Sequence, residues 1–348
     1  MAPRDQLDLF GGPPAQQVAA RDRAAARVGL LPPTPQQLAA AARLGPEVRL
    51  GTSSWSFPGW AGLVWDREAG EAELARDGLA AYARHPLLRT VGIDRSYYGP
   101  LSAVQYASYA AAVPPGFRFL AKAHEHVTLA RFADHPRSGA LRGQDNPRFL
   151  DAAYAAEAVV APFASGLGAA AGPLVFQFPP QPLSATLGKQ RFAEKLQAFL
   201  AALPKGPLYA VELRNRELLG PELATALAST GAALCYSAWQ HLPEVAQQAA
   251  KIAPDRMPAL VIRWMLPRGS DYESARERFA PFDRLQDEDL ETRRQIAGLV
   301  RQAMARGQGT WVTVNNKAEG CAPESVWRLA EEIAGGLVTA APAHPAEE

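Results

Sequence analysis

One apolar run of the chain reads Pro173-Leu174-Val175-Phe176-Gln177-Phe178 and stops at two further prolines. Its near-continuous apolar character is typical of a parallel β-strand that is buried on both faces of a sheet. Seven similar runs occur at residues 48–52, 90–94, 117–122, 209–213, 233–236, 259–263 and 310–314. Patterns typical of helices lie between them, for example at residues 71–84, 192–202, 221–229 and 287–305.

The alternation of these runs with helices predicts the fold class. Eight strand–helix repeats over about 290 residues predict an α/β fold, a (β/α)8 TIM-type barrel with a flexible N-terminal extension. An open, doubly wound sheet is the alternative, and it fits the number of repeats less well. The phosphate-binding runs G-x-G-x-x-G and G-x-x-x-x-G-K-[ST] are missing from the chain, which weakens the nucleotide-binding version of such a sheet.

We expect one barrel domain over residues 48–338, flanked by two tails. Residues 1–47 contain Gly11-Gly12-Pro13-Pro14 and Leu31-Pro32-Pro33-Thr34-Pro35. Because proline and glycine at this density interrupt long elements, this segment is expected to form a flexible Pro/Ala-rich tail or a loosely docked arm. Residues 339–348 alternate Ala, Pro and Glu and are expected to be disordered.

Composition excludes several classes of protein. The 348 residues include 36 Lys plus Arg and 35 Asp plus Glu, so a bulk polyelectrolyte binder is disfavoured, whereas a local basic groove is not. The two cysteines, Cys235 and Cys321, match no disulfide framework or zinc-binding spacing. The chain has no apolar run of about 20 residues and no secretory signal pattern. We therefore expect a soluble, cytoplasmic protein without a membrane partner.

Polar and aromatic residues follow the predicted strands, where the active site of such a barrel lies. The catalytic candidates are Asp94, Lys122 and Glu212. The candidates for ligand binding are Trp55, Trp60, Arg95, Tyr97, Gln177, Arg214, Asn215, Arg263, Asn315 and Asn316. Some of these residues also have simpler interpretations: Trp55 and Trp60 as packing residues, Gln177 as a strand cap, and Asn315 and Asn316 as turn residues.

Two arginines, Arg214 and Arg263, lie on or directly after predicted strands. Glu212 and Arg214 are two residues apart on a strand, so both face the same side. They form either a general base with an anion-binding arginine or a structural ion pair. Arg263 lies within an apolar strand, and a buried arginine requires an anionic partner or ligand. We expect Glu212 and Arg214 to line one cleft with Lys122, Gln177 and Asn315.

A divalent metal is a further candidate ligand of this cleft. His124 and His126 alternate with other residues after the third strand and would face the same side. Imidazoles at this spacing bind a metal only with further ligands, which Asp94 and Glu212 could supply.

Five segments together resemble the YecE-like family (domain of unknown function 72), and they occur in the order that the family has. The matching segments are GTSSWSFPGW (51–60), FRFLAKA (117–123), FQFPP (176–180), YAVELRN (209–215) and VNN (314–316). One segment departs: the family usually reads V-E-I-N-S-T-F-Y where this chain has VGIDRSYY at 91–98. The resemblance spans residues 48–333 and implies a (β/α) barrel. It implies no reaction, because the family is named for lacking one.

Three functions agree with these observations. The first is an enzyme acting on a phosphorylated or nucleic-acid ligand, such as a metal-assisted phosphodiester hydrolase associated with DNA repair. The second is a non-catalytic module that binds nucleic acid or protein. The third is a sugar isomerase or glycosidase, in which Glu212 needs a second carboxylate, and only Asp94 and Glu125 are obvious candidates.

A short peptide near the N-terminus suggests a partner. Gln6-Leu7-Asp8-Leu9-Phe10 is similar at every position to the peptide by which bacterial replication and repair proteins dock on the DNA sliding clamp. In such a peptide the Gln side chain forms hydrogen bonds in one pocket, and Leu and Phe fill an adjacent apolar one. The glycines and prolines at residues 11–14 would serve as the tether. Packing of this stretch against the barrel is the alternative.

We predict that a peptide of about the first 15 residues binds purified sliding clamp with a Kd no weaker than about 100 μM, roughly −5.5 kcal/mol. Calorimetric titration measures it. A peptide with Leu9→Ala and Phe10→Ala is the control, because it loses the side chains that fill the apolar pocket. Equal binding by both peptides, or by neither, contradicts the prediction.

Overall fold

The computed structural model describes residues 27–267 and 269–337. The segment Gln6–Phe10, predicted to bind the clamp, and the C-terminal tail from residue 338 lie outside the described residues.

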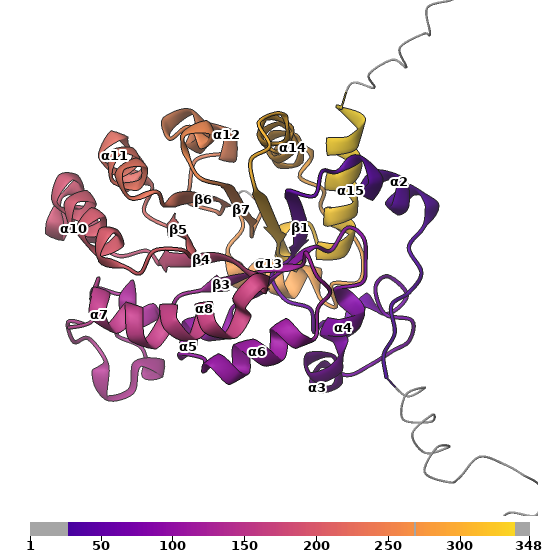
Figure 1. Ribbon diagram of the computed structural model, residues 1–348, viewed down its shortest axis with the longest axis horizontal. Coiled ribbons are helices and arrows are strands. Elements are labelled where there is room, and N and C mark those ends of the chain that lie inside the picture. Colours follow the sequence, from indigo (N-terminus) through magenta and orange to yellow (C-terminus); the bar gives the residue numbers. More distant parts are fainter. Residues whose placement is uncertain (1–26, 268, 338–348) are drawn as a thin grey trace, which may run out of the picture.

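Eight parallel strands form a closed barrel in sequence order, and β8 pairs with β1 to complete it (Figure 1). The strands are β1 (Val48–Thr52), β2 (Thr90–Ile93), β3 (Arg118–Lys122), β4 (Ala171–Phe178), β5 (Leu208–Leu213), β6 (Ala233–Ala238), β7 (Leu260–Trp264) and β8 (Thr310–Val314). The predicted TIM-type barrel is confirmed, with each predicted strand end within two residues of its observed position.

Helices surround the strands on the outside of the barrel (Figure 1). They are α2 (Pro35–Arg43), α3 (Glu71–Glu73), α4 (Leu79–Tyr82), α5 (Arg95–Tyr98), α6 (Ala103–Ala111), α7 (Ala152–Ala155), α8 (Ala161–Leu167), α9 (Leu183–Leu187), α10 (Lys189–Ala202), α11 (Pro221–Thr230), α12 (Val245–Lys251), α13 (Tyr272–Phe279), α14 (Leu290–Ala305) and α15 (Ala322–Gly335). The helix predicted at 71–84 consists of α3, a π-helical turn (Leu74–Gly78) and α4. None of the described helices is both long and apolar enough to cross a membrane.

Apolar residues at helical spacing fix the helices against the strands. In α15, Val326, Leu329, Ala330 and Ile333 are buried, which is the stripe expected of a helix that packs on a sheet. This helix contacts β1 and β8, where the barrel closes. The strands themselves are buried on both faces, so side chains fill the interior of the barrel.

Residues 27–47 differ from the expected flexible extension, because they pack on the barrel. The Thr34 side chain accepts a hydrogen bond from the Gln37 amide and thereby caps α2. Ala40 and Ala41 of α2 are buried, and the helix lies against α15. The Arg89 side chain also donates to the Ala41 carbonyl at 3.0 Å. Proline at the start of α2 initiates this helix rather than interrupting it.

Candidate functional site at the barrel mouth

A buried carboxylate links two arginines at the C-terminal ends of the strands. Glu212, on β5, is fully buried. One carboxylate oxygen lies 2.5 Å from Nη2 of Arg214, and the other lies 2.6 Å from Nη1 of Arg263 on β7. Both guanidinium groups are at least 95% covered by protein. Burial of a charged carboxylate requires partners of this kind, so the three groups form one unit.

A second carboxylate extends this unit toward solvent. Lys122, the last residue of β3, places its Nζ 3.1 Å from Oδ2 of Asp94. Nη2 of Arg263 lies 3.6 Å from the same Oδ2, so Arg263 connects the two carboxylates. The Asp94 side chain is 34% exposed, whereas that of Lys122 is 9% exposed. Solvent therefore reaches the cluster from the side of Asp94.

Neighbouring side chains hold the cations in place. Gln177 on β4 accepts a hydrogen bond from Nη1 of Arg263 at 3.0 Å. The Trp239 ring stacks over the guanidinium of Arg214, with 3.8 Å between its central carbon and the ring centre. The Tyr97 ring lies 5.3 Å from Nζ of Lys122. Cation–π contacts of this kind stabilise charges that have lost their water.

We call Asp94, Lys122, Glu212, Arg214 and Arg263 the charged cluster. Interactions within it shift the pKa values of Glu212 and Lys122. Burial favours a raised pKa for Glu212, but the charges of Arg214, Arg263 and Lys122 outweigh it and lower the pKa to about 2. Burial and the charge of Arg263 lower the pKa of Lys122 to about 8, against the opposing effect of the two carboxylates. Glu212 is therefore ionised at neutral pH, while Lys122 populates both its charged and its neutral form just above neutrality.

The charged cluster has more positive than negative groups. When Lys122 is protonated, three cations face only two carboxylates. Nε and Nη1 of Arg214 and Nη2 of Arg263 are buried, yet they find no hydrogen-bond acceptor in the described part of the chain. Oε1 of Glu212 and Oδ1 of Asp94 likewise form no hydrogen bond there. Buried polar groups are normally satisfied, so the charged cluster keeps unused hydrogen-bonding capacity, and three of these five atoms are donors on arginines.

The structure brings together four of the five residues that were predicted to share a cleft, but Asn315 takes another role. Glu212, Arg214 and Gln177 are joined through Arg263, and Lys122 through Asp94. The Asn315 side chain instead accepts a hydrogen bond from the Lys317 amide at 3.0 Å and caps a short 3-10 helix. It thus acts as a turn residue, which was one of the two interpretations of its sequence.

Trp60 and Asn316 are structural, which corrects their assignment to ligand binding. Trp60 is fully buried, and its Nε1 donates to Oδ1 of Asn316 at 3.2 Å. The same oxygen accepts from the amide of Ala322, the first residue of α15, at 2.8 Å. Both side chains therefore connect the β1 loop to α15 inside the protein. Trp55 is 8% exposed and packs edge-on against Tyr109, with ring centres 5.5 Å apart.

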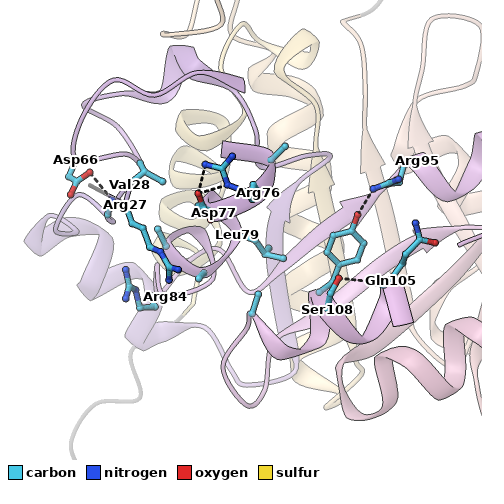
Figure 2. A pocket seen from close by; sticks show the side chains of 16 residues that line it. Arg27, Val28, Asp66, Arg76, Asp77, Leu79, Arg84, Arg95, Gln105 and Ser108 are labelled. Atoms are coloured by element: carbon cyan, nitrogen blue, oxygen red, sulfur yellow. Dashed lines mark hydrogen bonds and ion pairs between the residues drawn. The ribbon is translucent and has the colours of Figure 1, made fainter. Parts of the chain in front are cut away.

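Arg95 and Asn215 also lie apart from the charged cluster. Arg95 donates to the Tyr109 hydroxyl at 3.2 Å and lines a surface pocket of about 810 Å³ together with Arg27, Arg76 and Arg84 (Figure 2). Nδ2 of Asn215 donates to the Gln181 carbonyl at 2.7 Å, which fixes the loop after β4. The structure thus places these two residues away from the charged cluster, and their contact with a ligand stays a prediction.

The histidines proposed as metal ligands form a stacked pair. The rings of His124 and His126 lie 4.3 Å apart, and Nδ1 of His124 shares a hydrogen bond of 2.6 Å with the Tyr154 hydroxyl. Burial, His126 and Arg148 lower the pKa of His124 to about 4. Asp94 and Glu212, the expected additional ligands, face cations instead. Over residues 27–337, residue 268 aside, no three His, Cys, Asp or Glu side chains gather as a metal would require.

A cavity of about 900 Å³ is lined in part by Tyr97, whose ring faces Lys122, and it was not predicted from the sequence. We call it the β3–β4 groove, because its walls come mainly from the segments that follow these strands. Tyr97, His126, Phe132, Phe149 and Leu183 are among its lining residues. The segment between β3 and α7 contains two short 3-10 helices (Glu125–Val127 and Pro136–Leu141) and no α-helix or strand, so only its concentration of aromatic residues could have indicated the groove.

Comparison with known proteins identifies relatives over most of the chain. The sequence profile of the family described as "Protein of unknown function DUF72" matches residues 49–347. A DUF72 family protein of Enterococcus faecalis has a similar structure, with a TM-score of 0.56 and 18% identity, covering 84% of this chain and 97% of that one. One of Thermotoga maritima gives 0.54 and 19%, covering 82% and 98%. A search of curated proteins gave no match.

We predict that Glu212→Gln lowers the free energy of unfolding by about 3 kcal/mol at pH 7, because it leaves two buried arginines without their shared countercharge. Urea denaturation measures the change. Glu331→Gln, which breaks the exposed ion pair of Arg328 with Glu331 on α15, is the matched control and should cost less than about 1 kcal/mol.

The difference in unfolding free energy between wild type and Glu212→Gln should depend on pH. The folded-state pKa of Glu212, about 2, lies below its ordinary value of 4.5. Its stabilising effect is therefore complete above pH 4.5 and is lost as the pH falls toward 2. A difference in unfolding free energy that stays constant from pH 6 to pH 3 would show that the Glu212 charge does not stabilise the fold.

Proposed function

This chain belongs to the DUF72 family of proteins of unknown function, and we propose that it is an enzyme that binds a phosphorylated substrate at its barrel mouth. The observation behind this proposal is the surplus of buried positive charge, with nitrogen atoms of Arg214 and Arg263 that donate no hydrogen bond to any described residue. Guanidinium groups match the oxygens of phosphate in geometry and charge. The location also agrees, because enzymes with this fold use the C-terminal ends of the strands.

Arg214 and Arg263 are the anion-binding residues in this proposal. Glu212 and Gln177 act as positioning residues, since they fix the orientation of the guanidinium groups. A role for Glu212 as general base has little support. Both of its oxygens face guanidinium groups, and its pKa of about 2 makes it a weak base.

Lys122 is the proposed acid–base residue. A catalytic group works best when its pKa lies close to the pH at which the enzyme operates, and the pKa of Lys122 is about 8. Its Nζ lies beside the exposed carboxylate of Asp94, so it is the cation of the cluster nearest to solvent. Asp94 orients this ammonium group, and Lys122 transfers a proton to or from the substrate next to the bound phosphate.

The other functions expected from the sequence gain less support. A glycosidase needs two free carboxyl groups, whereas Glu212 pairs with two arginines and Asp94 with Lys122. Metal-assisted hydrolysis would need ligands that the described residues do not gather. A nucleic-acid phosphodiester remains one member of the proposed substrate class, and clamp docking through Gln6–Phe10 remains a prediction from the sequence.

We predict that pyridoxal 5′-phosphate, followed by borohydride, modifies Lys122 preferentially among the six lysines. The neutral amine adds to the aldehyde carbon, water leaves, and hydride reduces the imine to a secondary amine that peptide mass spectrometry locates. The rate should be half-maximal near pH 8, where Lys122 loses its proton. The exposed Lys205 serves as the reference lysine, and we expect it to be modified more slowly than Lys122 at pH 8.

Competition distinguishes phosphate binding from simple reactivity. Inorganic phosphate should protect Lys122 from modification and leave Lys205 unaffected, because phosphate occupies the site of the aldehyde reagent. Arg214→Gln should remove this protection while the variant still folds, as circular dichroism can verify. Equal modification of all six lysines, or protection that does not depend on Arg214, would contradict the proposal. Phosphate protection of a Lys122 that titrates near the ordinary lysine value of about 10.4 would favour a binding module without acid–base chemistry.

A further inference from the structure

The β3–β4 groove has the size and lining of a binding site for an organic group. At about 900 Å³ it falls in the range of small-molecule sites, which are concave and mostly apolar. Apolar and aromatic side chains from four separate segments line it, including Leu129, Phe132, Phe149, Leu183 and Leu187. The His126 ring meets the Phe132 ring edge-on, with centres 4.9 Å apart.

Two large apolar side chains at this groove are exposed to solvent. Tyr98 is 61% exposed and Leu141 is 40% exposed, and both line the groove. Single exposed apolar residues are common on protein surfaces. Two at the edge of one apolar cavity indicate a surface that a ligand covers.

Hydrogen bonds hold the walls of the groove in place without a ligand. The Gln181 side chain accepts from the Ala130 amide at 2.6 Å and donates to the Thr128 carbonyl at 2.9 Å. The Asn146 side chain donates to the carbonyls of His126 and Leu129, at 2.6 and 2.7 Å. These bonds connect parts of the segment between β3 and α7 to one another and to the loop after β4. The cavity is therefore largely preformed.

Tyr97 connects the groove to the charged cluster. Its ring lines the groove and also lies 5.3 Å from Nζ of Lys122. The groove and the Lys122 ammonium group therefore both border on Tyr97. An aromatic group directly attached to a phosphate has the dimensions to occupy both places at once.

We propose that the β3–β4 groove binds the aromatic body of the substrate whose phosphate binds at the charged cluster. The substrate class is thus a phosphate monoester of an aromatic or ring-bearing alcohol. Planar rings pack well against the edges and faces of Tyr97, Tyr98 and Phe132. This inference rests on the proposed function, since the phosphate site must exist for the groove to select among phosphates.

Three probes test the inference on the full-length protein: methyl phosphate, 1-naphthyl phosphate and 1-naphthol. We expect wild type to bind naphthyl phosphate at least tenfold more tightly than methyl phosphate, measured by calorimetry or by ligand-observed NMR. The two surface substitutions Tyr98→Ala and Leu141→Asp, combined, should reduce this ratio below threefold and leave methyl phosphate binding unchanged. Val104→Asp alters an exposed apolar residue on α6 that does not line the groove, and it should change neither affinity.

Arg214→Gln separates failure of this inference from failure of the proposed function. This substitution should weaken the binding of both phosphates and leave the binding of 1-naphthol unchanged. If both phosphates bind equally to wild type and both depend on Arg214, the groove inference is wrong and the phosphate site stands. If naphthyl phosphate and naphthol bind equally and neither responds to Arg214→Gln, the phosphate site is absent and both proposals fall.

Discussion

The shared carboxylate of Glu212 is the interaction on which the barrel mouth depends. An ionised carboxylate without water is stable only beside cations with good geometry, and Arg214 and Arg263 supply them at 2.5 and 2.6 Å. These contacts connect β5 to β7 across the interior, and Gln177 adds β4 through its bond to Arg263. Three strands of the barrel are thereby held in one arrangement by polar contacts in a region that is otherwise apolar.

Two other polar residues near the barrel mouth, Lys317 and Cys235, form no ion pair with the charged cluster in the described part of the chain. Lys317 is nearly buried, with its Nζ 4.1 Å from the Tyr272 ring centre and 5.6 Å from that of Phe282, so aromatic rings hold its charge. Burial raises the pKa of the Cys235 thiol well above its ordinary value, so this neighbour of the cluster remains a neutral thiol. Within the charged cluster, the surplus of positive charge comes from Lys122, Arg214 and Arg263.

The sequence predicted the structure well where burial dictates the residue type. It predicted less where side chains of different loops pack against one another. Strands buried on both faces must be apolar, so a charged residue such as Arg263 within one could be identified as exceptional. The two-residue spacing placed Glu212 and Arg214 on the same side. Nothing local distinguishes Trp60, which is fully buried, from a tryptophan that stacks on a ligand. The groove depends on contacts between segments far apart in the chain, such as those of Gln181 with Thr128 and Ala130.

Arg263 makes the structural and the chemical roles of the cluster inseparable. Its charge stabilises ionised Glu212 and, at the same time, disfavours the charged form of Lys122. A variant that relieves one effect therefore changes the other. A phosphate bound at the guanidinium groups would offset the charge of Arg263 and add a negative charge near Lys122, which raises the pKa of this lysine. Binding of the anion itself would then draw a proton onto Lys122, so the lysine becomes a proton donor when the site is occupied.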